Sequence, residues 1–208
     1  MIKDYLNRIA NTTLQGDARE ESYYPHFSNF LSAFAYEIGK IKIQITTLPK
    51  KTEAGNPDFR VWDGNQHIIG YIEAKKPGEK LEVIESTNQL KRYRSTFPNL
   101  ILTDFYEFRL YRNGELIDKV LIGRPFVAKK LKTVPPIENE VKFISLLEKF
   151  FRLRFQKFSQ QKILRLSLQK ELGFCVTKLF PKNSKKKKRV RVKYSDSIRR
   201  LNNIWLLI

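Results

Sequence analysis

Along the first 151 positions, segments whose apolar residues have helical spacing are followed by segments whose apolar residues have strand-like spacing. Over residues 17–38 they recur every three or four positions, which predicts an amphipathic helix. The isoleucines of residues 41–45 alternate with polar side chains and predict a half-buried strand. Residues 81–97 return to helical spacing, and the apolar run Asn99–Thr103 predicts a short buried strand.

Turn signals divide the remaining apolar stretches. An Asp-Gly-Asn turn at 63–65 and an Asn-Gly turn at 113–114 each separate two strand-like segments, so we expect two β-hairpins. A Pro-Gly pair at 77–78 ends the third strand, and residues 138–151 form a final amphipathic helix pattern. The order is helix, three strands, helix, strand, hairpin and helix, which predicts a mixed α/β domain with a central sheet.

The first hairpin carries the candidate chemistry. Asp58 lies on one strand, and Glu73 and Lys75 lie two positions apart on the other, so the last two share one face. Two carboxylates and one ammonium that converge suit a hard divalent cation and an activated water. The alternative is that Asp58 is a turn residue and that Glu73 and Lys75 form a solvated strand end.

Composition and cysteine content limit the class of protein. With 208 residues, 41% of them hydrophobic, the chain has room for one domain and an appendage. No apolar run reaches the ~20 residues of a membrane helix, and the first residues lack a signal peptide's apolar region, so we expect a cytoplasmic protein. A single cysteine, Cys175, excludes an internal disulfide and a thiolate zinc cluster. His26 and His67 have no partners at metal-ligand spacing.

The formal net charge of +19 is unevenly spread along the chain. Residues 152–208 hold 17 Lys and Arg against two acids, whereas residues 1–151 are only mildly basic. A basic tail of this kind is typical of a nucleic-acid-binding arm.

The order of elements, with Pro-Asp at 57–58 and Glu-Ala-Lys at 73–75, resembles the PD-(D/E)xK nuclease superfamily. Residues 16–122 are more specifically similar to the N-terminal nuclease domain of single-chain restriction-modification enzymes, in which a nuclease is fused to an adenine-specific DNA methyltransferase. The segments that carry this similarity are AREESYYP, GNPDFRVWDG, IGYIEAKKPG, NQLKRYR and NLILTDFYEFRLYRNGE. The resemblance implies a restriction-endonuclease-like core, with a central mixed sheet flanked by helices.

The resemblance also implies a role for each matching residue. Asp58 and Glu73 would bind Mg²⁺ or Mn²⁺, with the Ala74 carbonyl as a further ligand. Lys75 would orient or deprotonate the attacking water and stabilise charge on the phosphate. Glu20 matches an acid that lies near the metal in many such nucleases, and its alternative role is a capping box at the start of the first predicted helix.

A downstream helix supplies the candidate DNA contacts. Gln89 and Tyr93 match a motif that braces the catalytic site or touches DNA. Since they lie four positions apart on a helix, Tyr93 has the alternative of being a core residue. Lys91, Arg92 and Arg94 are candidate phosphate contacts, and their alternative is a solvated basic face.

The basic tail has an alternative origin. If a one-nucleotide frameshift occurred near Phe151, Gln169–Phe180 could be recoded in the shifted frame as AKRTGFLRDEVI, which resembles the helical linker after the nuclease in the fused family. The lysine run at 185–188 recodes in the same frame to a Glu-rich helix. We therefore expect a nuclease-like domain at residues 1–151, and at residues 152–208 a basic, out-of-frame or poorly ordered tail of a truncated reading frame.

These observations predict a metal-dependent endonuclease of the restriction-modification kind that hydrolyses phosphodiester bonds in double-stranded DNA. The methyltransferase and target-recognition domains of the intact family protein are expected to be absent, which predicts little sequence specificity and salt-sensitive binding. One alternative is a catalytically silent fragment that acts as a DNA- or protein-binding module. The other is a nucleic-acid-binding protein whose function resides in the tail.

Overall fold

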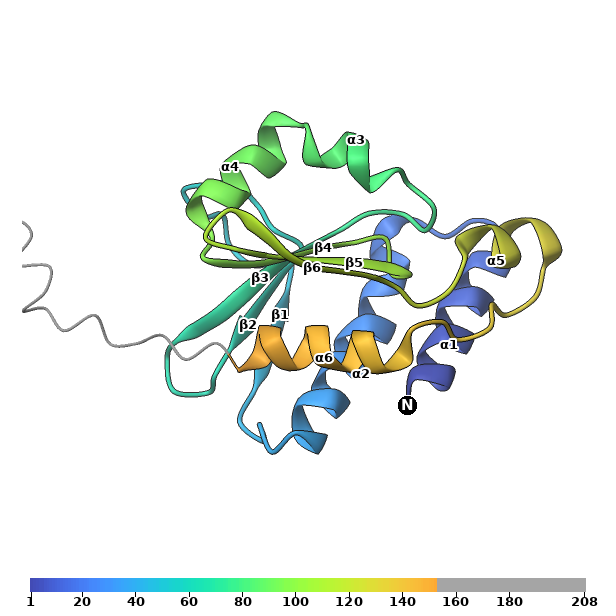
Figure 1. Ribbon diagram of the computed structural model, residues 1–208, viewed down its shortest axis with the longest axis horizontal. Coiled ribbons are helices and arrows are strands. Elements are labelled where there is room, and N and C mark those ends of the chain that lie inside the picture. Colours follow the sequence, from blue (N-terminus) through green and yellow to red (C-terminus); the bar gives the residue numbers. More distant parts are fainter. Residues whose placement is uncertain (153–208) are drawn as a thin grey trace, which may run out of the picture. The chain divides into compact units, whose positions relative to one another are not determined.

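Six strands form one mixed sheet in the computed structural model, which describes residues 1–152 (Figure 1). The strands are β1 (Gln44–Thr47), β2 (Phe59–Trp62), β3 (Ile68–Ala74), β4 (Asn99–Thr103), β5 (Glu107–Arg112) and β6 (Glu115–Leu121). They lie side by side in sequence order; β3 and β4 are parallel and the other four neighbouring pairs are antiparallel. Both predicted hairpins, β2–β3 and β5–β6, are confirmed. The predictions for the tail beyond Arg152 lie outside the described residues.

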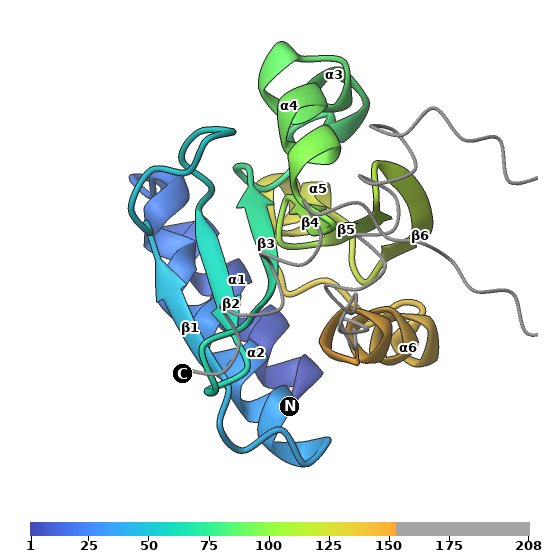
Figure 2. The same cartoon turned by 90° about the vertical axis from the view of Figure 1, so that its left-hand side faces the viewer.

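Helices cover both faces of this sheet (Figures 1 and 2). α1, α2 and α6 share one apolar cluster with the sheet, and α3 and α4 share another on the opposite face. The bounds are α1 (Ile2–Gln15), the 3₁₀ turn η1 (Glu20–Tyr23), α2 (Tyr24–Glu37), α3 (Leu81–Glu85), α4 (Asn88–Thr96), α5 (Pro125–Leu131) and α6 (Glu140–Phe151). The predicted mixed α/β fold, with a central sheet flanked by helices, is confirmed. Within the described residues, no helix has the length and apolar character needed to cross a membrane.

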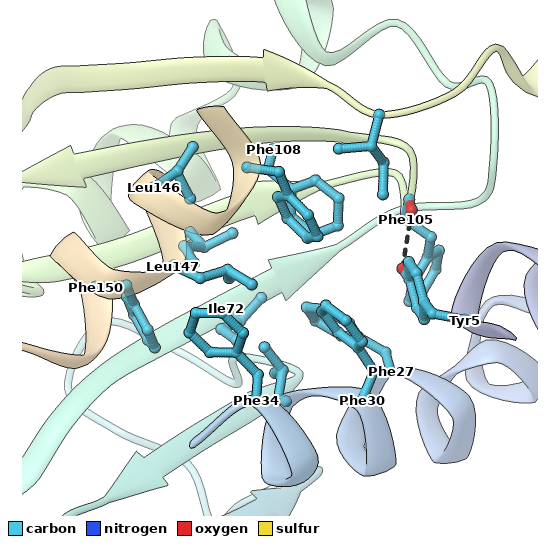
Figure 3. Packing of buried hydrophobic residues seen from close by; sticks show 14 of the residues in the cluster. Tyr5, Phe27, Phe30, Phe34, Ile72, Phe105, Phe108, Leu146, Leu147 and Phe150 are labelled. Atoms are coloured by element: carbon cyan, nitrogen blue, oxygen red, sulfur yellow. Dashed lines mark hydrogen bonds between the residues drawn. The ribbon is translucent and has the colours of Figure 1, made fainter. Parts of the chain in front are cut away.

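Aromatic rings fill the space between the sheet and α1, α2 and α6 (Figure 3). Phe27 packs edge-on against Phe59 and Phe105, with ring centroids 5.4 and 5.8 Å away. Tyr5 stacks on Phe30 at 4.6 Å, and its hydroxyl donates a hydrogen bond of 2.8 Å to the Phe105 carbonyl oxygen. This bond satisfies a buried hydroxyl and joins α1 to the turn after β4.

A smaller apolar cluster lies between the sheet and α4. Tyr93 of α4 and Phe97, which directly follows α4, pack over Leu100 and Leu102 of β4. Phe97 also stacks on Tyr71 of β3 at 3.9 Å. All five residues of β4 are buried because helices cover both of its faces. This explains why the sequence of β4 is an uninterrupted apolar run rather than an alternating one.

The chain crosses from β3 to β4 through α3 and α4, so both strands end at the same edge of the sheet. The Lys75 amide donates to the Thr103 carbonyl oxygen at 2.8 Å. The buried Asp104 carboxylate accepts a hydrogen bond of 2.8 Å from the Gly78 amide. These bonds fix the loop after β3 against the end of β4, and they place the Glu-Ala-Lys motif at this edge.

α1 and α5 were not among the predicted elements. The buried residues Ile2, Tyr5, Leu6 and Ile9 of α1 follow the spacing i, i+3, i+4, i+7, so the helical pattern was present in the sequence. α5 has seven residues, which is less than two helical turns, so its apolar spacing is too short to predict a helix.

Two predicted helices have different boundaries in the structure. The pattern at 17–38 is divided between η1 and α2, and Pro25 lies in the first turn of α2, where its missing N–H leaves no helical bond unmade. The pattern at 81–97 is divided between α3 and α4. Thr87 starts α4, since its hydroxyl oxygen accepts a hydrogen bond from the Leu90 amide at 3.3 Å.

Gly70 of β3 occupies a position without room for a side chain. A Cβ added there would lie 2.7 Å from the Asn99 carbonyl oxygen and 2.6 Å from Phe150 Cε2. We expect Gly70→Ala to lower the free energy of unfolding, measured with urea, by about 1–3 kcal/mol because of this overpacking. Ser32→Ala on the exposed face of α2 should change it by no more than about 0.5 kcal/mol. Equal effects of the two variants would contradict the packing described here.

Candidate active site

The hairpin β2–β3 brings two carboxyl groups to one edge of the sheet. Asp58 immediately precedes β2, and the antiparallel register pairs the next residue, Phe59, with Ile72 of β3. The buried Asp58 carboxylate accepts a hydrogen bond of 2.8 Å from the Ala74 amide. This side-chain bond to the neighbouring strand holds Asp58 beside Glu73, as the sequence pattern predicted.

Glu73 is almost completely buried, with 2% of its surface exposed. Its Oε1 accepts hydrogen bonds from Lys75 Nζ at 2.8 Å and from Gln89 Nε2 at 3.1 Å. Its Oε2 is buried and has no hydrogen-bond partner within the described residues. A buried carboxylate oxygen without a partner costs free energy, so this atom requires an explanation beyond folding.

The surroundings of Glu73 favour its neutral form. Burial, and then the negative charge of Asp58, raise the pKa of Glu73 to about 8, against the opposing charge of Lys75. Burial alone would lower the pKa of Lys75, but the carboxylates of Glu73 and Glu20 raise it above its ordinary value. Lys75 is therefore a cation near neutral pH, and ionisation of Glu73 beside Asp58 would leave one negative charge of the pair uncompensated.

Glu20 belongs to this site rather than to a helix cap. Its Oε1 lies 3.7 Å from Lys75 Nζ, and burial raises the pKa of its carboxyl group. The residue before η1 is Arg19, whose amide donates to the Ser22 hydroxyl oxygen at 3.1 Å, so Glu20 is the first residue of η1 and not the third. The capping alternative for Glu20 is therefore not found in the structure.

Tyr24 is a site residue that the sequence analysis missed. Its hydroxyl group lies 2.6 Å from Asp58 Oδ1 and 3.0 Å from Glu20 Oε1, and it donates toward these oxygens. Burial and the Asp58 charge raise the pKa of Tyr24, so it keeps the proton that it donates. Tyr24 follows Glu20 by four positions, a spacing that puts two side chains close together on a helix and that could have indicated this contact.

Gln89 and Tyr93 lie on α4, on the side that faces Glu73. Besides its bond to Glu73, Gln89 Nε2 donates to the Tyr93 hydroxyl oxygen at 3.2 Å. The Tyr93 ring is fully buried in the α4 cluster. The structure thus puts Tyr93 in the core while its hydroxyl group holds Gln89 against the carboxylate.

The three basic residues of α4 have different surroundings. Arg94 donates two hydrogen bonds, of 3.0 and 2.7 Å, to the Gly114 carbonyl oxygen and lies over the Tyr111 ring at 4.8 Å. Arg92 donates to the Ala54 carbonyl oxygen at 3.4 Å. Lys91 is exposed and forms no ion pair within the described residues. Arg94 therefore serves the fold, and Lys91 is the residue most available to a ligand.

The acidic pair could hold a cation with help from backbone groups. Ala74, at the end of β3, is buried and its amide already binds Asp58. In residues 1–152, no three or more His, Cys, Asp or Glu side chains are grouped to hold a metal by themselves. A cation here would need the free Glu73 Oε2, the remaining lone pairs of Asp58, and a carbonyl or water oxygen.

Comparison with known proteins supports the fold. No protein-family model and no curated protein matches the chain. Among solved structures, the fold is similar to that of a chain in the DrdV–DNA complex determined by cryo-electron microscopy, with a TM-score of 0.54 and 24% sequence identity. The match covers 73% of this chain and 14% of that chain. This chain therefore corresponds to a small part of the length of the protein that it matches.

Glu73 should make the stability of the metal-free protein depend on pH. Its pKa is raised from 4.5 to about 8 in the folded protein, so between these values the folded form holds a proton that the unfolded chain has lost. Unfolding then releases a proton, and the free energy of unfolding should fall as the pH rises through this window. The slope can reach about 1.4 kcal/mol per pH unit.

Urea denaturation in EDTA at several pH values measures this dependence. Glu73→Gln should flatten it, because the amide does not titrate. Glu79→Gln, at an exposed position five residues from β3, should leave it as in the wild type. If Glu73→Gln left the slope of the unfolding free energy against pH unchanged, a group other than Glu73 would be responsible for the pH dependence.

Proposed function

We propose that the described domain is a metal-dependent DNA endonuclease that hydrolyses phosphodiester bonds. The observation that carries the proposal is the buried Glu73 carboxyl group beside Asp58 and Lys75, whose Oε2 has no hydrogen-bond partner among residues 1–152. The similarity of the fold to a chain of a DNA complex supports DNA as the substrate. The motif resemblance supports the restriction-modification kind of nuclease.

Asp58 and Glu73 are the residues that would hold Mg²⁺ or Mn²⁺, with the Ala74 carbonyl and Glu20 as further candidates. The donor set is made of oxygens, which magnesium prefers to nitrogen or sulfur. A bound cation would supply the positive charge that the acidic pair lacks. When bound, magnesium polarises a phosphate oxygen and lowers the pKa of a coordinated water.

Lys75 would act on the phosphate as a hydrogen-bond donor. Because its pKa is raised, its ammonium group does not readily lose a proton to become the amine that could act as a base on water. It is suited instead to orient the attacking water and to stabilise the charge that develops on the phosphate oxygens. Its bond to Glu73 Oε1 places it at the rim of the site before substrate arrives.

Tyr24 and Gln89 would keep the two carboxylates in position. Tyr24 fixes one oxygen of Asp58, and Gln89 fixes one oxygen of Glu73. Each bond leaves lone pairs of the carboxylate free for a ligand. Such preorganisation reduces the cost of ordering the site when substrate binds.

Cleavage of supercoiled plasmid in the presence of Mg²⁺ tests the proposed function. We expect the wild type to nick the plasmid, and Asp58→Ala and Lys75→Ala to lose activity by at least ~100-fold, since each removes charge from the reacting centre. Lys80→Ala and Glu79→Gln, from the exposed segment after the site, are the matched controls and should retain activity. Equal cutting by wild type and Asp58→Ala would disprove the assignment.

Metal binding can be measured without cleavage. A ligand that binds only the folded state raises the free energy of unfolding, by about 1.4 kcal/mol at ten times its dissociation constant. We expect added MgCl₂ to raise the thermal midpoint of the wild type, and to have little effect on Asp58→Asn. NaCl at matched ionic strength is the control for screening. Equal stabilisation of both proteins by MgCl₂ would place the cation elsewhere.

A binding module without catalysis is the second candidate. The chain spans 14% of the chain that it matches in the DrdV–DNA complex, so further parts can be needed for cutting. This candidate is supported if the folded wild type binds duplex DNA and magnesium but cleaves no faster than Asp58→Ala.

A further inference from the structure

A small basic pocket is lined in part by residues that neighbour those of the acidic site in the chain. It has a volume of about 190 Å³ and lies among α1, η1, the loop after β3, and α5. Its lining includes Lys76, Lys129 and Lys132, and no Asp or Glu of residues 1–152 lines it. Lys76 directly follows Lys75 in the chain, and the lining residue Tyr23 directly precedes Tyr24. The pocket and the acidic site therefore share two segments of backbone.

The three lysines of this pocket have no counter-charge within the described residues. Their side chains are exposed, and none of the ion pairs in residues 1–152 includes Lys76, Lys129 or Lys132. Ammonium groups that line one small pocket repel each other. An anion bound between them would attract each of them and so offset this repulsion.

Two of the lysines reach the pocket from α5 and its C-terminal end. Lys132 ends α5 in the left-handed conformation, with φ 55° and ψ 34°, where glycine or asparagine is usual. Lys129 Nζ lies 3.2 Å from the point that a Cβ of Gly78 would occupy, so the glycine leaves room for the ammonium group. Gly78 is itself held by the hydrogen bond that its backbone amide donates to the Asp104 carboxylate.

We propose that Lys76, Lys129 and Lys132 bind a backbone phosphate of DNA next to the phosphate at the acidic site. This inference rests on the proposed function, which supplies DNA as the ligand. The pocket is smaller than the ~300–1,000 Å³ typical of small-molecule sites, but it is large enough for a phosphate group. Contacts of this kind set the position of the duplex and carry no sequence information.

DNA binding by the full chain without metal tests the inference. Fluorescence anisotropy with a labelled duplex, repeated over a series of salt concentrations, gives both the affinity and its salt dependence. Lys129→Ser/Lys132→Gly should bind several-fold more weakly, and the slope of log K against log salt should lose about one unit of magnitude. Because glycine favours the left-handed conformation, Lys132→Gly should not lower the thermal midpoint.

The matched control is Lys130→Ser/Lys142→Ser, which removes the same charge from exposed positions outside the pocket. The basic residues of the tail are present in every variant, so their contribution cancels in the comparison. An equal loss of affinity and slope in the control would overturn the inference, and so would an unchanged slope in the pocket variant.

Titration with inorganic phosphate distinguishes a free anion from DNA. Amide chemical shifts of Gly78 and Lys132 report occupancy of the pocket. Saturable shifts with phosphate, together with an unchanged DNA slope, would assign the pocket to a free anion and overturn the DNA contact. Failure of the proposed function can be distinguished from failure of this inference. If the slope of log K against log salt decreases in the pocket variant while the wild type does not cleave plasmid, the phosphate contact stands without the nuclease activity.

Discussion

A buried carboxyl group with too few partners is the constraint on which the site depends. Glu73 is removed from water at the end of a central strand, where an ionised carboxylate is costly unless it is paired and hydrogen-bonded. Lys75 and Gln89 bind one of its oxygens, and the other has no partner within the described residues. The open oxygen is therefore the strongest indication of a ligand.

Segments far apart in the sequence converge on this carboxyl group because of the sheet topology. The hairpin β2–β3 contributes Asp58, and α2 contributes Tyr24, which lies 34 positions from Asp58. The parallel pairing of β3 and β4 requires a crossover, and α4 within that crossover carries Gln89. The loop after β3 also contributes Lys76 to the basic pocket. The local positive charge of this pocket, rather than the small net charge of the domain, would attract a phosphate.

Much of the architecture followed from local patterns. Turn residues predicted both hairpins, and the uninterrupted apolar run predicted β4 as a buried strand. The sequence alone predicted that one hairpin brings together Asp58, Glu73 and Lys75, because a two-stranded hairpin has a regular register. Helix boundaries were less predictable, since Pro25 in the first turn of α2 and the Thr87 side-chain cap of α4 divide stretches whose apolar spacing is continuous.

The sequence by itself determined the elements, their order and the acidic motif, because periodicity and turn chemistry act between near neighbours. Tertiary structure alone decided which side chains meet across the fold. It joined Tyr24 to Asp58, turned Arg94 toward a backbone carbonyl instead of solvent, and left Glu73 Oε2 without a partner in the part of the chain that the structure describes. The physical reason is that burial, orphaned polar atoms and pKa shifts depend on atoms that are close in space but distant along the chain.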